Sequence, residues 1–318
     1  MREGPTCLIS REYMGACRPL VSVCIGAYNR KDYIRECIDS ALAQTWLNKE
    51  VVVVDDASTD GTREILKTYG DQIRLILRET NSGICPITRN QAAAASAGEL
   101  VAFLDSDDVW YPEKLAKQVA FMGDHPEVPL CHTLCDVIDE SSRVTGVRHG
   151  KSVVPSTGPI FESLLDHCWV TISTVMVRRS LFEEVGWFNP EAPYGYLGED
   201  HEFFLRVSRR HPIGLVPEVL AGFRKAGQGI TATNWTANPE PVPLFQALLK
   251  RRDIWEGMVP RHRMVRALTD KCDDNAYFYR NRNQWIRAAW FACQAVKANP
   301  LDGRAWRQLL AAGLRRGA

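Results

Sequence analysis

The sequence L-V-A-F-L-D-S-D-D-V-W-Y-P, residues 100–112, decides the fold. Its first five residues are apolar without alternation, which is typical of a strand buried on both faces of a parallel sheet. Three carboxylates follow at once, those of Asp105, Asp107 and Asp108. Pro112 suits the first position of the helix that the apolar spacing after it predicts. The stretch therefore predicts a strand that carries an acidic cluster to its carboxyl end, where open α/β sheets bind their ligands.

Two interpretations of the acidic cluster are open at this point. Carboxylates this close repel one another unless a positive group shares the site, and Mg²⁺ commonly binds one or two carboxylates together with water and substrate phosphates. Asp and Ser are also frequent in turns and at helix N-caps, and Asp108 in particular can cap the helix that follows. The pattern D-x-D is too short to decide between a metal site and a cap.

Strands and helices alternate before the acidic cluster. Apolar runs predict strands over 20–25, 51–54 and 73–77, and helical spacing predicts helices after the first two of them, the second capped by Ser58 or Thr59. This alternation predicts a parallel sheet with right-handed crossovers. Polar loops follow the strands, at residues 26–30, 55–62 and 81–90. Since the carboxyl ends of parallel strands share one edge, these loops should converge on one crevice.

Composition indicates a globular chain in a reducing compartment. Of 318 residues, 45% are hydrophobic and 24% are charged, and the net charge of +1 gives no reason to expect nucleic-acid binding. The first 19 residues contain no apolar core of a secretory signal, and no apolar run is long enough to span a membrane. Most of the ten cysteines lie in apolar runs, which predicts buried free thiols and a cytoplasmic location. Cys131, His132 and Cys135 lack the second pair of a zinc site, so packing is the favoured interpretation for them.

Five motifs in a fixed order resemble the family 2 glycosyltransferases, over about residues 19–231. The motifs are V-S-V-C-I-G-A-Y-N-R, V-V-V-V-D-D-A-S-T-D-G-T, N-S-G-I-C-P-I-T-R-N, F-L-D-S-D-D-V-W-Y-P and G-E-D-H-E-F-F-L-R. The resemblance implies an α/β fold of the GT-A type, with a mostly parallel central sheet flanked by helices and a Rossmann-like nucleotide-binding half. A Rossmann dehydrogenase is disfavoured, because no G-x-G-x-x-G follows the first strand.

The resemblance also suggests how the chain divides. We expect an N-terminal extension over 1–18 and a GT-A domain over 19–235. Within that domain, 19–122 would bind the nucleotide and 123–235 the acceptor. Prolines 239, 241 and 243 mark a linker, and the helical periodicity after it predicts a helical C-terminal region over 236–318.

The first strand and the second loop are the expected nucleoside site. By resemblance, Gly26, Ala27, Tyr28, Asn29 and Asp56 would hold the nucleoside. Tyr28 offers an aromatic face to a base, and Asp56 offers an acceptor to a base N–H or a sugar hydroxyl. Gly26 and Ala27 keep the backbone open to a ligand. The alternative for Tyr28 and Asn29 is a loop that only caps the next helix.

The diphosphate end of the donor would meet Arg89 and the acidic cluster. Guanidinium groups bind phosphate in a bidentate way, so Arg89 is the expected phosphate contact. Its alternative is an ion pair with Asp55, Asp56 or Asp105. The resemblance suggests Asp107 as the direct ligand of Mn²⁺ or Mg²⁺, with Asp105 contacting ribose or the metal.

Glu199 and Asp200 are the expected catalytic pair. Carboxylates in the first turn of a helix are favoured by its dipole alone, so their position does not by itself imply catalysis. The E-D segment, however, matches the catalytic segment of the family, in which the Asp is the general base. The resemblance therefore implies that Asp200 activates the acceptor hydroxyl, that Glu199 supports it, and that a single displacement inverts the anomeric centre. Lys225 and Ala226 occupy a position where many relatives carry a histidine, a difference that bears on metal dependence.

The predicted function is transfer of a sugar from a nucleoside diphosphate sugar, UDP favoured by the family, to an acceptor hydroxyl in glycan, polysaccharide or glycoconjugate synthesis. The alternatives are a nucleotidyltransferase, and a non-catalytic nucleotide-binding or scaffold protein that uses its helical C-terminus for partners. From Ala276 onward eight Lys and Arg face one acid, Asp302. This basic segment suits peripheral contact with the inner face of a membrane, a partner protein, or a solvated helical cap.

Overall fold

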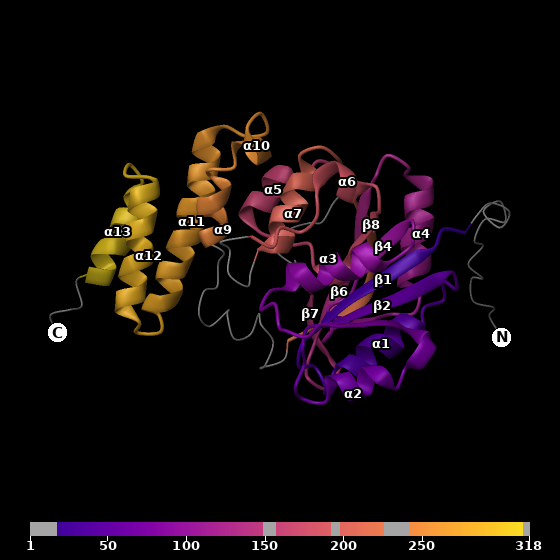
Figure 1. The fold of residues 1–318 in the computed structure, drawn as a ribbon. Coiled ribbons are helices and arrows are strands. Elements are labelled where there is room, and N and C mark those ends of the chain that lie inside the picture. Colours follow the sequence, from indigo (N-terminus) through magenta and orange to yellow (C-terminus); the bar gives the residue numbers. More distant parts are fainter. Residues whose placement is uncertain (1–17, 149–156, 192–197, 226–241, 314–318) are drawn as a thin grey trace, which may run out of the picture.

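The structure, a computed structural model, describes residues 18–148, 157–191, 198–225 and 242–313. A twisted sheet flanked by helices forms the larger part, and a group of helices extends from one side of it (Figure 1). The sheet has nine strands in the described residues, in the order β3-β2-β1-β4-β8-β6-β9-β5, with β7 paired to β6.

The first half of the sheet is parallel, as the alternation of strands and helices predicts. It is built from β1 (Val21–Ala27), β2 (Lys49–Asp55), β3 (Arg74–Leu77) and β4 (Leu100–Phe103). The connections contain α1 (Ile34–Leu42), α2 (Thr62–Lys67), a 3-10 turn (Gly70–Gln72) and α3 (Cys85–Ala95). The carboxyl ends of these strands therefore point to the same edge of the sheet.

The second half of the sheet is mixed. Strand β8 (Met176–Arg178) lies antiparallel between β4 and β6 (Leu130–Ile138), and β9 (Ile213–Arg224) runs parallel to β6. Two short antiparallel strands complete it, β5 (Val109–Trp110) on β9 and β7 (Val144–Arg148) on β6. The helices of this half are α4 (Lys114–Asp124), α5 (Phe161–Asp166), a 3-10 turn (Ile172–Thr174), α6 (Leu181–Val185) and α7 (Glu199–Ser208). The predicted α/β fold with a largely parallel sheet is confirmed.

Helices alone follow the sheet in the described C-terminal part. They are α9 (Val242–Leu248), α10 (Arg252–Trp255), α11 (Arg261–Arg280), α12 (Trp285–Ala298) and α13 (Gly303–Gly313). Helix α11 packs on α9 and α5, and Arg263 Nη2 lies 2.7 Å from Asp166 Oδ1 of α5. In the part of the chain that the structure describes, every helix is too short or too polar to cross a membrane.

The core has two clusters, one on each face of the sheet. Alternate residues of β1 divide between them: Val23 and Ile25 belong to the cluster that contains α1, whereas Cys24 belongs to the cluster that contains residues of α3, α7 and the C-terminal helices. Residues 51–54 of β2 are all buried, which explains why the sequence of this strand is a continuous apolar run. The eight described cysteines are free thiols, as their apolar settings predict.

Three local features differ from the sequence expectations. Helix α3 begins at Cys85, six residues before the predicted start, because Pro86 fits its first turn. Helix α2 follows Gly61, at φ +101°, and Asp60 rather than Ser58 or Thr59 accepts the Thr62 N–H. Residues 172–174 form a 3-10 turn, so the predicted strand over 171–178 is shortened to its last three residues.

Strand β6 separates the residues considered for zinc. Cys131 and Cys135 pack in the cluster that contains α1. His132 lies on the opposite face, 5.2 Å from the Trp169 ring between centroids, because successive strand residues point to opposite faces. Burial lowers the pKa of His132 to about 4. The three side chains therefore do not converge on one point.

Candidate active site

Asp108 anchors the acidic loop, residues 105–108, to neighbouring parts of the fold. Its carboxylate accepts hydrogen bonds from Ser173 Oγ at 2.5 Å and from the Arg224 backbone N–H at 2.8 Å. Burial, with Asp107 and Asp105 close by, raises the pKa of Asp108 well above its usual range. The residue before α4 is Glu113, so Asp108 does not cap that helix. Its role in the geometry is to join the acidic loop to β9 and to the turn at Ser173.

Asp105 and Asp107 are the two carboxylates of the loop that solvent reaches. Asp105 Oδ1 lies 2.8 Å from Arg89 Nη2, and Asp107 Oδ2 lies 3.5 Å from Arg30 Nε. Burial raises the pKa of Asp107, Asp105 adds to this, and Arg30 opposes it. The buried Arg30 Nε has no hydrogen-bond partner among the residues that the structure describes. Arg30 is a site residue that the sequence analysis missed, although it closes the motif G-A-Y-N-R.

The donor set fits a divalent cation that substrate helps to bind. No group of three His, Cys, Asp or Glu side chains in the described ranges forms a metal cluster on its own. Mg²⁺ is typically held by one or two carboxylates plus substrate phosphates, and Asp105 and Asp107 offer that many. Asp105 and Asp107 carry like charges, and Arg30 Nε lies 3.5 Å from Asp107 Oδ2. A further positive charge would therefore reduce the repulsion between the two carboxylates.

Arg89 links the acidic loop to the predicted catalytic helix. Its Nη1 lies 2.5 Å from Glu199 Oε1, and its Nη2 bonds Asp105. The side chain is buried, and its guanidinium lies 5.9 Å from the centre of the Phe188 ring. Burial alone would lower the pKa of Arg89, but the two carboxylates raise it. Arg89 therefore forms an ion pair with Asp105, which the sequence analysis gave as the alternative to a phosphate contact.

Helix α7 places Glu199 and Asp200 in its first turn. Gly198 precedes them with φ +115°, a conformation that L side chains rarely adopt, and a Cβ there would approach Leu244 Cδ2 at 3.0 Å. Asp200 is partly buried, and burial together with the Glu199 charge raises its pKa to about 7. A carboxyl group with a pKa near neutrality is suited to general-base catalysis.

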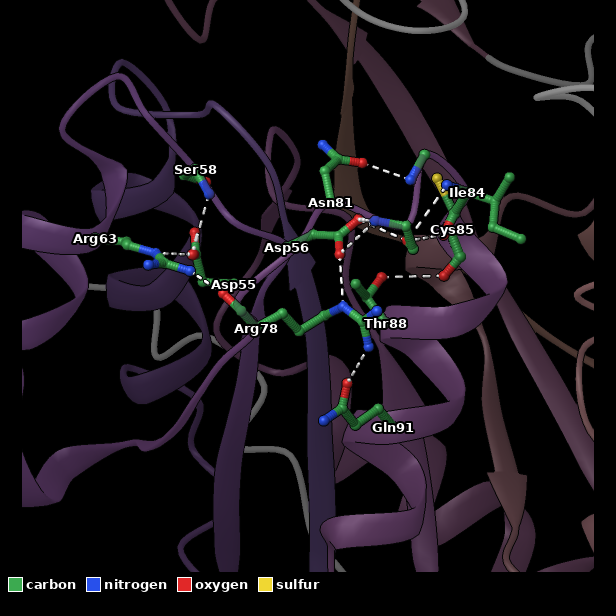
Figure 2. Close-up of polar contacts among 12 residues, drawn as sticks. Asp55, Asp56, Ser58, Arg63, Arg78, Asn81, Ile84, Cys85, Thr88 and Gln91 are labelled. Atoms are coloured by element: carbon green, nitrogen blue, oxygen red, sulfur yellow. Dashed lines mark hydrogen bonds and ion pairs between the residues drawn. The ribbon is translucent and has the colours of Figure 1, made fainter.

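The loops after β2 and β3 hold Asp56 firmly (Figure 2). Asp56 accepts hydrogen bonds from Arg78 Nε at 2.7 Å and from Ser82 Oγ at 2.6 Å, and Arg78 also bonds Gln91 of α3. The adjacent Asp55 is paired separately with Arg63 Nε at 2.5 Å. Arg78 and Ser82 were not predicted. Their contact with Asp56 spans more than twenty residues, which no short motif reveals.

The loop after β1 contains the other predicted nucleoside residues. The Tyr28 side chain is exposed, so its ring face is open, whereas Ala27 is buried. Asn29, at φ +50°, accepts the Thr59 N–H at 2.8 Å, and no side chain caps α1. Gly26 faces α3, where an added Cβ would overlap the Thr88 side chain. Its small size therefore serves the close approach of α3 to β1.

Arg224, at the end of β9, was also missed by the sequence analysis. It donates from Nε to the Asp107 carbonyl at 2.6 Å and from Nη2 to Glu36 Oε2 at 2.7 Å, and its side chain is buried. It therefore holds the backbone of the acidic loop. Lys225 is exposed, and Ala226 lies outside the described residues.

Comparisons with known proteins bear on the family of the chain. The family model "Glycosyl transferase family 2" matches residues 22–186. An uncharacterized glycosyltransferase of Rickettsia typhi is 31% identical over 294 residues, covering 90% of this chain and 87% of that protein.

Two solved structures share the fold. S. aureus TarS 1–349 in complex with UDP-GlcNAc has a TM-score of 0.64 and 22% identity, covering 92% of this chain and 88% of that one. A mannosyltransferase from Pyrobaculum calidifontis, in complex with GDP-Man and Mn²⁺, has a TM-score of 0.53 and 19% identity, covering 94% and 87%. The match to the family model and the long alignment with a glycosyltransferase show that this chain belongs to glycosyltransferase family 2.

Proposed function

We propose that the chain transfers a sugar from a nucleoside diphosphate sugar to an acceptor hydroxyl, with inversion, and that a divalent cation assists. The observation that carries the proposal is the buried bridge from Asp105 through Arg89 to Glu199. It ties Asp105, one of the two carboxylates suited to a metal and diphosphate, to the helix that bears Asp200. Donor and acceptor functions would thus be held at a fixed spacing.

In this proposal Asp200 accepts the proton of the acceptor hydroxyl. The acceptor oxygen then bonds to the anomeric carbon, the bond from that carbon to the diphosphate breaks, and the nucleoside diphosphate leaves with the electron pair. Asp105 and Asp107 would hold Mn²⁺ or Mg²⁺, which when bound supplies positive charge to the diphosphate. Glu199 pairs with Arg89, and its proximity favours the proton on Asp200.

On the donor side, we assign the nucleoside to the open face of Tyr28 and to the region of Asp56. Both Asp56 oxygens already accept hydrogen bonds from Arg78 or Ser82, so the carboxylate is presented in one orientation. A carboxylate fixed in this way is a suitable acceptor for a base N–H. UDP is the favoured nucleotide, since the similar TarS structure was solved with UDP-GlcNAc.

A thermal-unfolding panel tests the proposal. UDP, GDP, TDP and CDP are each added with Mn²⁺, with Mg²⁺ or with a chelator. A nucleotide at 100 times its Kd should add about 2.7 kcal/mol to the free energy of unfolding. We expect one nucleotide to stabilise the protein in a metal-dependent way, and Asp107→Ala to lose the metal-dependent part. The absence of any shift would contradict the proposal and favour the non-catalytic alternative.

A further inference from the structure

The C-terminal helices expose an unusual amount of apolar surface. Twelve large apolar side chains are exposed in the described residues, and six of them lie within 277–310. They are Tyr277, Ile286, Trp290, Leu301, Trp306 and Leu310. Two of the six are tryptophans, with 52% and 46% of their surface exposed. Single exposed apolar residues are ordinary, whereas a contiguous apolar patch would mark an interaction surface.

Four of these side chains lie on two neighbouring helices. Ile286 and Trp290 are one turn apart on α12, and Trp306 and Leu310 are one turn apart on α13. The two helices pack on each other, and Ala292, Ala295 and Ala305 on them are fully buried. We call Ile286, Trp290, Trp306 and Leu310 the outer face. A solvated helix would carry polar residues at such positions.

Helices α12 and α13 lie at one end of the molecule, with α11 between them and the sheet domain (Figure 1). Helix α11 contacts α5 and α9, and Gln246 Nε2 of α9 also donates to Gln294 Oε1 of α12. The side chains of the outer face stay exposed in this arrangement.

The charge of this segment indicates what the outer face meets. From Ala276 to the end there are eight Lys and Arg and one Asp, a net charge of +7, in a chain whose net charge is +1. The residues before Ala276 therefore carry 1 − 7 = −6. Lys297, on α12, and Arg307, beside Trp306 on α13, are exposed. Helices α12 and α13, which expose the indoles, contain four basic and no acidic residues, and one of the four, Arg304, pairs with Asp270 and Asp302.

We propose that the outer face docks on the surface of a bilayer that contains anionic lipid. Trp side chains favour the headgroup level, where the ring is desolvated and its N–H can still bond water, and Lys and Arg are attracted by anionic headgroups. A second copy of this chain would bring the basic residues of its own α12 and α13 to the same contact, which opposes association. Nucleic acid would match the charge but leave the aliphatic side chains without a partner. The proposal is independent of the donor and of the metal.

Vesicle co-sedimentation of the full chain tests the proposal. The probes are vesicles of phosphatidylcholine alone and vesicles with phosphatidylglycerol added. We expect binding only to the anionic vesicles, weakened by salt because exposed charges are screened. The double variant Trp290→Ser/Trp306→Ser should bind about tenfold less tightly, as should Lys297→Glu/Arg307→Glu, which keeps the indoles. The matched control is Leu47→Ser/Leu77→Ser, which removes two exposed apolar residues of the sheet domain and should bind normally.

Three results would overturn the proposal. One is failure of the wild-type chain to bind the anionic vesicles. Another is unchanged binding by both double variants, each shown by circular dichroism to be folded. The third is a wild-type dimer in sedimentation equilibrium that the Trp variant loses, since this would assign the outer face to a second copy of the chain.

Discussion

At the scale of single residues, Asp200 makes the proposed reaction sensitive to pH. Its pKa is raised to about 7 by burial and by Glu199, and only the carboxylate form can accept a proton. Turnover of the donor should therefore rise about tenfold per pH unit below 7 and level off above it. The measurement is release of nucleoside diphosphate between pH 5 and pH 9, with nucleotide affinity followed in parallel. A rate that does not change between pH 5.5 and pH 8 would exclude Asp200 as the base.

The same raised pKa predicts a pH-dependent stability. The folded protein holds the Asp200 proton more tightly than the unfolded chain, whose Asp has the ordinary pKa of 3.8. Stability from this group is present below that value and is lost as the pH rises toward 7. Asp200→Asn cannot ionise, so it should gain on the order of 1–2 kcal/mol over wild type at pH 8, and little at pH 4. Urea unfolding at both pH values checks this, and an equal effect at both would contradict it.

Gly26 predicts a steric effect. A Cβ at this position would overlap the Thr88 side chain, so Gly26→Ala should lower the free energy of unfolding by about 1–3 kcal/mol. Thr88→Ala in the same chain should recover part of the loss, because the nearest atom in the overlap is Thr88 Oγ1. Urea unfolding measures both. Gly313→Ala, with no atom near its Cβ position, is the control. If the effects of the two substitutions on the free energy of unfolding simply add in the double variant, the Thr88 side chain does not restrict the size of residue 26.

At the scale of secondary-structure elements, Arg89 joins α3 to α7. Arg89→Met would leave Asp105 and the buried Glu199 without their shared cation, and breaking a buried pair of this kind costs about 3–5 kcal/mol. The control is Arg210→Met, because Arg210 and Glu184 form an exposed pair on the same protein that should contribute less than about 1 kcal/mol. Chemical unfolding of the two variants compares them, and similar losses would mean that the bridge adds little to stability.

The elements themselves were largely predictable from sequence. Residues 51–54 and 100–103 are apolar throughout because both faces of their strands are covered, and this pattern is visible without a structure. The start of α3 was placed six residues late, since its first turn consists of Cys85, Pro86 and other residues that are weak helix formers. The start of α7 at Glu199 was correct, because the preceding glycine and the acidic first turn both mark a helix start.

At the scale of the whole molecule, the sequence predicted which loops meet but not how their side chains pair. Asp56, Asp105 and Glu199 follow from motifs on separate loops. Their partners depend on contacts between distant parts of the chain: Arg89 to Glu199 spans 110 residues, and Arg224 to the Asp107 carbonyl spans 117. Pairings at that separation are set by sheet order and by helix packing. For this reason Arg30, Arg78 and Arg224 had no signal strong enough to assign them a role in advance.

The central claim is that one crevice binds the donor with one set of residues and activates the acceptor with Asp200. The most direct test measures nucleotide affinity and donor turnover in Asp200→Asn, with Glu183→Gln, an exposed acid of α6, as the control. We predict a nucleotide Kd within about threefold of wild type and turnover reduced by a factor of about 10² or more, since a positioned base contributes that much. Glu183→Gln should match wild type in both. Turnover of Asp200→Asn close to the wild-type rate would contradict the account.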